Sequence, residues 1–302
     1  MKTIDIYDHL FILRPMLHLP VWTIMILGYY RSQPADSSWY ILPVSLLLGT
    51  GIFGAVFLTN QIYDIESDRL NNKLFFLPRG IVKLSVAWLM TILLNFVSLI
   101  AAFSISFSVG LASLLVIILG ILYSVPPIAL KNKDWLAAFA NGLGHGTLVF
   151  VIGYCAGGGS FIGGIVKSIP YFMAVAAVYI GTTLPDIEGD QETGKLTIGV
   201  VFGVQKTVYI ILLYYIAAII FGYLTNDTPF LLASLFAAPF YIWLVISKTI
   251  KAAVLAIKIS ILSLTFAAGY YYPGYIVFLI GLIIATRFYY KRRFNMTYPS
   301  IK

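Results

Sequence analysis

The chain has 302 residues, of which 60% are hydrophobic and only 11% are charged, and its mean hydropathy is +0.91. Soluble proteins carry about 25% charged residues, so this composition excludes a soluble enzyme. It indicates an integral, multi-pass membrane protein, located in the plasma membrane if the source is a prokaryote. The net charge of +8 is expected to reflect membrane orientation, because Lys and Arg gather in cytoplasmic loops, and no nucleic-acid partner is expected.

Ten apolar segments are long enough to span a membrane as helices, which need about 20 residues each; barrel strands would instead be alternating segments of about ten. The segments cover residues 10–30, 40–63, 84–105, 107–125, 135–158, 168–187, 206–224, 229–247, 252–269 and 274–290. The first follows a charged start and lacks a small-residue cleavage site, so we interpret it as a span and not as a signal peptide.

The basic residues give an orientation. With a cytoplasmic amino terminus, all 20 Lys and Arg residues except Arg31 and Lys167 fall on the cytoplasmic side. A nine-span count would place the basic carboxyl-terminal cluster outside, which favours ten. The expected fold class is therefore all-α: one membrane domain over residues 1–302, a helical bundle of nine to ten spans around a central cavity open to the cytoplasmic side.

Two short acidic stretches end the second and sixth apolar segments. They contain seven of the chain's 12 acidic residues, namely Asp64, Glu66, Asp68, Asp186, Glu188, Asp190 and Glu192. Both carry the spacing Asp-x-x-x-Asp, and Asn60 extends the first by one more step of four. Residues four apart lie on one face of a helix, so each stretch is expected to form an oxygen-bearing stripe. The recurrence suggests two similar halves, about 1–130 and 131–302.

Both segments run toward the cytoplasm, so the two stretches are expected to face each other across one cavity. Carboxylates gathered there repel one another unless a cation lies among them, and Mg²⁺ prefers carboxylates together with phosphate oxygens. Two acidic helix ends that merely face water are a weaker explanation, because the spacing recurs and ionisable groups at a membrane are usually functional. We therefore expect a Mg²⁺ site that binds a diphosphate.

Basic and aromatic side chains near the stretches fit this chemistry. Arg69, Lys131 and Lys195 are expected to contact the diphosphate, although each is also explained as a charge of a cytoplasmic loop. A diphosphate at the mouth of an apolar chamber indicates an isoprenoid tail in the membrane. Tyr123 and Tyr179 lie in the relevant segments, where aromatic faces stabilise a carbocation. His145 lies among glycines with no acid at helical spacing, so we interpret it as a packing residue and not as a proton carrier.

Three motifs occur in order along the chain. They are Asn60…Asp64…Asp68, then Tyr123-Ser-Val-Pro-Pro127 followed by Lys131, then Asp186-Ile-Glu-Gly-Asp190-Gln-Glu-Thr-Gly194-Lys195. In order and in position relative to the spans, they resemble the signatures of the UbiA superfamily of intramembrane prenyltransferases. The likeness covers nearly the whole chain. Three features depart from the family. Gln61 stands where many members have Asp, the loop Phe75-Phe-Leu-Pro78-Arg79-Gly80 only loosely follows the family's Arg-Pro…Gly stretch, and the family usually has nine spans.

The resemblance implies a role for each matching residue. Mg²⁺ and the diphosphate would be bound by Asn60, Asp64, Asp68, Asp186 and Asp190. Lys131, Lys195 and Arg14 would contact the diphosphate, and Tyr123 would lie by the reacting carbon. The four aspartates and Tyr123 are therefore the predicted catalytic residues.

The predicted function is Mg²⁺-dependent transfer of a polyprenyl group from a prenyl diphosphate, such as geranylgeranyl diphosphate, to a lipophilic acceptor in the membrane lipid, with release of pyrophosphate. The acceptor offers an aromatic carbon or a lipid hydroxyl, and the sequence leaves both open. A divalent-cation or proton-coupled transporter is the alternative, but transporters place charges near the middle of their spans. An enzyme that only hydrolyses or cyclises the diphosphate would need no second substrate.

Overall fold

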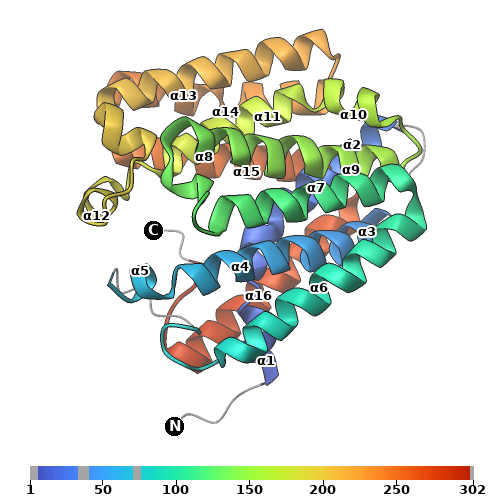
Figure 1. Cartoon of the computed structure of the whole chain (residues 1–302). Helices are drawn as coiled ribbons and strands as arrows, with labels where there is room; N and C mark the ends of the chain where they lie inside the picture. The colour runs from blue at the N-terminus through green and yellow to red at the C-terminus, as the bar shows by residue number, and fades with distance from the viewer. Residues whose placement is uncertain (1–5, 33–40, 71–75, 300–302) are drawn as a thin grey trace.

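The computed structural model describes residues 6–32, 41–70 and 76–299, and most of them are helical. The helices form one bundle (Figure 1). The long ones are α6 (Leu84–Ile105), α7 (Phe107–Ser124), α13 (Ile198–Leu224), α14 (Thr228–Ser247), α15 (Ile250–Tyr271) and α16 (Pro273–Phe294). The all-α prediction is thus confirmed over the described ranges, whose one β contact is an isolated bridge between Lys133 and Leu196.

The remaining spans are assembled from shorter helices. These are α1 (Ile6–Phe11) with α2 (Leu19–Ser32), α3 (Ile41–Leu48) with α4 (Gly54–Tyr63), α8 (Asp134–Asn141) with α9 (Val149–Ala156), and α10 (Phe161–Lys167) with α11 (Ile169–Thr182). Nine helical stretches within the described residues are long and apolar enough to cross a membrane, or ten if α10 and α11, which meet at 51°, form one span. This agrees with the predicted nine to ten spans.

Two of these spans contain a π-helical segment. Gly49–Phe53 joins α3 to α4, and Gly142–Leu148 joins α8 to α9. A π-helical turn contains one more residue than an α-helical turn, so it rotates the side chains that follow it. Such turns are frequent at functional sites. Phe53 and His145, one from each segment, line the same internal cavity.

Helix α2 lies in the middle of the bundle and packs closely against α9. Its side chains from Val21 to Leu27 are buried. A Cβ atom on Gly28 would clash with the carbonyl oxygen of Phe150, and one on Gly153 with that of Met25. Small residues of this kind let two membrane helices approach closely. The carboxyl-terminal half of α2 is therefore held close to α9.

The first and last spans are joined at one end of the bundle. The fully buried carboxylate of Asp8, in α1, accepts hydrogen bonds from the Tyr289 hydroxyl and from the Arg293 guanidinium, whose Nη2 lies 2.7 Å away. A buried charge is tolerated when it is paired and hydrogen-bonded in this way. The beginning of the first span therefore lies beside the end of the last.

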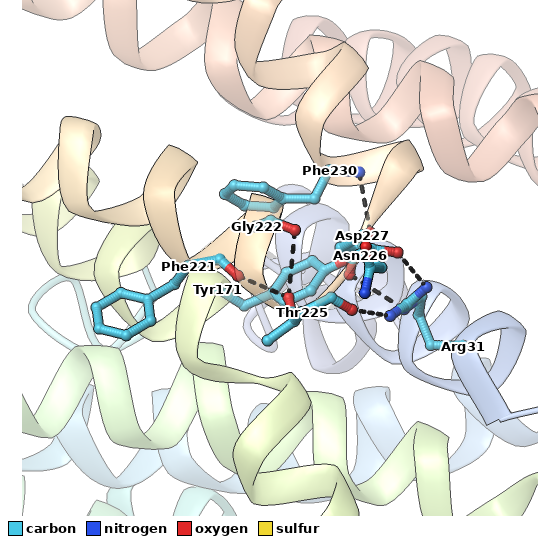
Figure 2. Close-up of polar contacts among 8 residues, drawn as sticks. All are labelled: Arg31, Tyr171, Phe221, Gly222, Thr225, Asn226, Asp227 and Phe230. Atoms are coloured by element: carbon cyan, nitrogen blue, oxygen red, sulfur yellow. Dashed lines mark hydrogen bonds and ion pairs between the residues drawn. The ribbon is translucent and has the colours of Figure 1, made fainter.

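Arg31 holds the carboxyl-terminal end of α2 in place. It is one of the two basic residues that depart from the predicted charge distribution. Its guanidinium lies 3.4 Å from the buried Asp227 carboxylate and donates to the carbonyl oxygens of Asn226 and Thr225 (Figure 2). Asp227 also accepts from the Tyr171 hydroxyl at 3.1 Å. Burial raises the pKa of the Asp227 carboxyl above its usual range, and the charge of Arg31 opposes this rise. Arg31 is thus the counter-charge of a buried acid.

Replacing Arg31 with alanine is expected to destabilise the protein by about 3 kcal/mol and to lower Tm in detergent by about 5 °C, because a buried carboxylate loses its partner. The pKa of Asp227 then rises further, and the ionised carboxylate is penalised once the pH exceeds that pKa. The loss in Tm should therefore be larger at about pH 8 than at about pH 5. Asp227→Asn, which keeps the side-chain shape, should lower Tm less. An equal loss at both pH values would contradict this account.

Candidate active site

The first acidic stretch lies where α4 ends. α4 stops at Tyr63, Asp64 adopts φ −101° and ψ 3°, and α5 (Ile65–Leu70) begins at the next residue. The single helix expected for the stripe is therefore interrupted at Asp64. The four-residue spacing survives in the backbone, since the Asp64 N–H donates to the Asn60 carbonyl at 3.0 Å and the Asp68 N–H to the Asp64 carbonyl at 2.7 Å.

The second acidic stretch repeats this backbone geometry. Asp186 adopts φ −100° and ψ 6° directly before α12 (Ile187–Glu192). The Asp190 N–H donates to the Asp186 carbonyl at 2.8 Å. The first aspartate of each stretch thus has the same conformation at the start of a short helix.

One cavity of about 390 Å³ is bordered by both acidic regions. Its charged lining residues are Asp64, Glu66, Lys131, Glu192 and Lys195. The backbone bridge between Lys133 and Leu196 joins the loop that carries Lys131 to the loop that carries Lys195. Two segments distant in sequence are therefore held side by side at this cavity.

Tyr123, near the end of α7, is linked electrostatically to both acidic stretches. It interacts electrostatically with the carboxylates of both Asp64 and Asp190 and forms side-chain hydrogen bonds with Asn141 and Tyr179. Asp64 and Asp190 therefore both lie within electrostatic range of the Tyr123 hydroxyl group. The structure thus brings together the two stretches and the tyrosine that the sequence singled out.

Cationic side chains contact the first stretch. The Lys131 ammonium group lies 2.6 Å from Asp64 Oδ1, while Asn60 donates to Asp64 Oδ2 at 3.1 Å. Arg14 lies 3.8 Å from Asp68. The backbone of Arg14 has φ 54° and ψ 61°, a left-handed conformation that is uncommon outside glycine and that clusters at functional sites. These contacts bring Asn60, Lys131 and Arg14 to the predicted site.

Arg69 and Asp186 lie further out. Arg69 is exposed and its guanidinium is 3.9 Å from the exposed Glu66 carboxylate, one turn away. Asp186 is exposed, whereas Asp190 and Lys195 are half-buried. Arg69 and Asp186 can therefore take their predicted roles only if the bound diphosphate extends from the cavity to its exposed edge.

The side chains at this cavity are suited to a hard cation. Asp64 lines the cavity, while Asn60 and Asp190 lie on the segments that border it, and their carboxylate and amide oxygens are the ligands that Mg²⁺ prefers. The Lys131 ammonium group beside Asp64 marks a place where positive charge is stabilised. Among the residues that the structure describes, no three His, Cys, Asp or Glu side chains are gathered as a ready metal cluster, so the diphosphate oxygens would complete the coordination.

Two largely apolar chambers lie within the bundle. The first chamber, of about 210 Å³, has Arg14, Asn60 and Tyr123 in its wall, together with apolar side chains such as Phe57 and Val116. The second chamber, of about 220 Å³, lies between α2, α11 and α15. Asn141 and His145 line both chambers. The structure thus offers two neighbouring apolar spaces that meet at one wall.

Two residues of the site were missed by the sequence analysis. Asn141 carries no motif, but it donates to the Ala137 carbonyl and hydrogen-bonds Tyr123. Gln61, noted only as a departure from the family, is buried and donates to the Ile12 carbonyl at 2.9 Å. That bond ties α4 to the turn that carries Arg14, so an amide donor is required where a carboxylate would lack a proton to give.

The fold and the site together define a class of protein. It is a multi-span helical membrane protein with two acidic stretches close to two apolar chambers. A sequence model of the UbiA prenyltransferase family matches residues 21–252. The chain therefore belongs to the UbiA prenyltransferase family, as the three motifs predicted.

The names of individual relatives indicate different prenyl acceptors. The 2-acyl-4-prenylphloroglucinol 6-prenyltransferase of Humulus lupulus is 30% identical over 183 residues, which cover 53% of this chain and 42% of that protein. The digeranylgeranylglyceryl phosphate synthase of Sulfurisphaera tokodaii is 23% identical over 192 residues, which cover 61% of this chain and 67% of that protein. The chain spans about half the length of the plant relatives that it matches.

The fold also occurs in solved structures. A UbiA homologue from Archaeoglobus fulgidus, bound to GPP and Mg²⁺, superposes with a TM-score of 0.68 at 22% identity, over 88% of this chain and 98% of that chain. A UbiA homologue from Aeropyrum pernix superposes with a TM-score of 0.67 at 18% identity, over 85% of this chain and 96% of that chain. At these identities the likeness shows a shared fold.

Proposed function

We propose that this protein is an intramembrane prenyltransferase. It transfers a polyprenyl group from a prenyl diphosphate to a lipophilic acceptor and releases pyrophosphate. The observation that carries the proposal is the cavity bordered by residues of both acidic regions, beside a chamber whose wall includes Asn60 and Tyr123. Family membership and the neighbour bound to GPP and Mg²⁺ support it.

Each part of the site has a task in this reaction. Asn60, Asp64, Asp68, Asp186 and Asp190 hold Mg²⁺ and through it the diphosphate, and Arg14, Arg69, Lys131 and Lys195 contact the diphosphate directly. When bound, Mg²⁺ neutralises the charge that develops on the leaving group. The apolar first chamber takes the isoprenoid tail and excludes water from the reacting carbon. The Tyr123 ring stabilises positive charge there.

The site faces the cytoplasm in this proposal. The acidic stretches lie at the ends of spans, and the basic loops that favour a cytoplasmic position surround them. The buried contact of Asp8 with Arg293 places the first and last spans together at one end, which supports ten spans with α10 and α11 forming one of them.

Product formation tests the proposal. Purified protein in nanodiscs is incubated with radiolabelled geranylgeranyl diphosphate, Mg²⁺ and either phenolic or glyceryl phosphate acceptors. The expected result is a prenylated acceptor and one pyrophosphate for each product. Pyrophosphate released without an acceptor would indicate a hydrolase or cyclase, and Mg²⁺ flux into proteoliposomes without product would indicate the transporter.

A further inference from the structure

The proposed reaction uses the first chamber for the isoprenoid tail and leaves the second chamber without an assigned ligand. The first chamber has Arg14 and Asn60 in its wall, so a diphosphate held at the acidic stretches extends its tail into that space. The second chamber meets the first at Asn141 and His145, and its wall includes Tyr179, which hydrogen-bonds Tyr123. A molecule in the second chamber would therefore approach the reacting carbon from another side than the diphosphate.

The lining of the second chamber restricts what it binds. It includes no Asp, Glu, Lys or Arg side chain. Burying an isolated carboxylate or phosphate there would be strongly unfavourable, whereas a neutral ring gains from the apolar wall. The chamber therefore suits an uncharged apolar body with few polar groups.

Most polar side chains of the second chamber already have partners. The Thr23 hydroxyl hydrogen-bonds Tyr275 at 2.8 Å, the Tyr171 hydroxyl donates to Asp227, and the Ser260 hydroxyl donates to the Ala256 carbonyl at 2.9 Å. These groups hold the helices together and have little capacity left for a ligand.

His145 differs from them. Its buried Nδ1 has no hydrogen-bond partner among the described residues. Its ring lies 5.0 Å from the Phe53 ring and 5.8 Å from the Phe57 ring, between centroids. A buried nitrogen without a hydrogen-bond partner is unfavourable. A half-turn of the ring exchanges Nδ1 with a carbon, so the nitrogen can face either chamber. The π-helical segment Gly142–Leu148 places this imidazole at the wall between the chambers.

We propose that the second chamber binds the acceptor as a neutral phenol, and that His145 hydrogen-bonds the phenolic hydroxyl group. This inference rests on the proposed function. A phenol held in this way presents the ring carbon beside its hydroxyl group to C1 of the prenyl group. The ring supplies the electron pair of the new C–C bond while the C1–O bond breaks, and that bond's electron pair leaves with pyrophosphate. The attacked carbon then loses its proton to a pyrophosphate oxygen and regains aromaticity.

A matched pair of substitutions separates the chambers. Val178→Phe narrows the second chamber, and Val116→Phe narrows the first. The full chain in nanodiscs is assayed with geranylgeranyl diphosphate, Mg²⁺ and 1-naphthol, a neutral phenol with a single hydroxyl group. Val178→Phe is expected to raise KM for the phenol at least about tenfold and to change Kd for the diphosphate less than about twofold. Val116→Phe is expected to weaken diphosphate binding instead.

Substitutions of His145 test the hydrogen bond. His145→Leu should raise KM for the phenol about tenfold, which corresponds to the loss of one hydrogen bond, and His145→Gln should recover part of that loss.

Three results would overturn the inference while the diphosphate still binds with Mg²⁺. They are weaker diphosphate binding in Val178→Phe with an unchanged KM for the phenol, equal KM values for His145→Leu and the unsubstituted protein, and use of an anionic glyceryl phosphate acceptor in preference to the phenol. Absence of Mg²⁺-dependent diphosphate binding in the unsubstituted protein would contradict the proposed function itself, and the inference with it.

Discussion

Asparagine in place of Asp64 or Asp190 is expected to lower kcat/KM for prenyl transfer by about 10³-fold. Each substitution keeps the size of the side chain but removes a negative charge beside the cation. Metal ions stabilise a leaving group by several kcal/mol, and about 4 kcal/mol corresponds to that factor. The two variants should be alike because each removes one carboxylate from the same proposed cation site, although the two residues lie in different acidic stretches.

A matched variant separates loss of the site from loss of the fold. Asp134→Asn removes an acid from the start of α8, outside both stretches, and is expected to change kcat/KM by less than about threefold. The three variants are compared for product formation and for Tm in the same detergent. Full activity in either Asp64→Asn or Asp190→Asn, with Tm unchanged, would show that this stretch does not hold the cation.

Methionine in place of Lys131 is expected to have two opposite effects. The ammonium group now lies 2.6 Å from Asp64 Oδ1, where it competes with a metal ion. Its loss should therefore tighten the binding of Mg²⁺ alone, measured by calorimetry. It should also lower kcat/KM for transfer by about 10²-fold, because one charge-assisted contact to the diphosphate is lost.

Lys133→Met provides the control for this pair of effects. Lys133 lies two residues further along the same loop and its side chain is exposed, while its backbone forms the bridge to Leu196. Both measurements are expected to stay within about twofold of the unsubstituted protein. The same tightening of Mg²⁺ in both variants would indicate a general effect of charge and not a contact of Lys131.

The spans were predictable from sequence because each needs about 20 apolar residues and little else. Their interruptions were not. The π-helical segments at Gly49–Phe53 and Gly142–Leu148 contain glycines that pack closely against neighbouring helices, and hydropathy does not report such contacts. Arg31 departed from the expected charge distribution because it pairs with the buried Asp227. That residue lies in a loop nearly two hundred residues away in the sequence.

The candidate site was predictable as a set of residues but not as a geometry. The spacing of Asn60, Asp64 and Asp68 indicated one side of a helix, and the backbone bonds keep that spacing even though α4 ends before Asp64. The ion pair of Lys131 with Asp64 and the contacts of Tyr123 depend on how α7 meets α4 and α11. Such contacts leave no pattern in a single sequence, and neither do the partners of Asn141.

Binding of radiolabelled geranylgeranyl diphosphate to the purified protein, with Mg²⁺ and with a chelator, tests the central claim most directly. The account predicts saturable binding at one site, at least about tenfold weaker when the metal is removed, since the acidic stretches then repel the diphosphate. Binding of equal strength in chelator, or no binding to a protein with an unchanged Tm, would contradict a site in which the two acidic stretches hold the diphosphate through Mg²⁺.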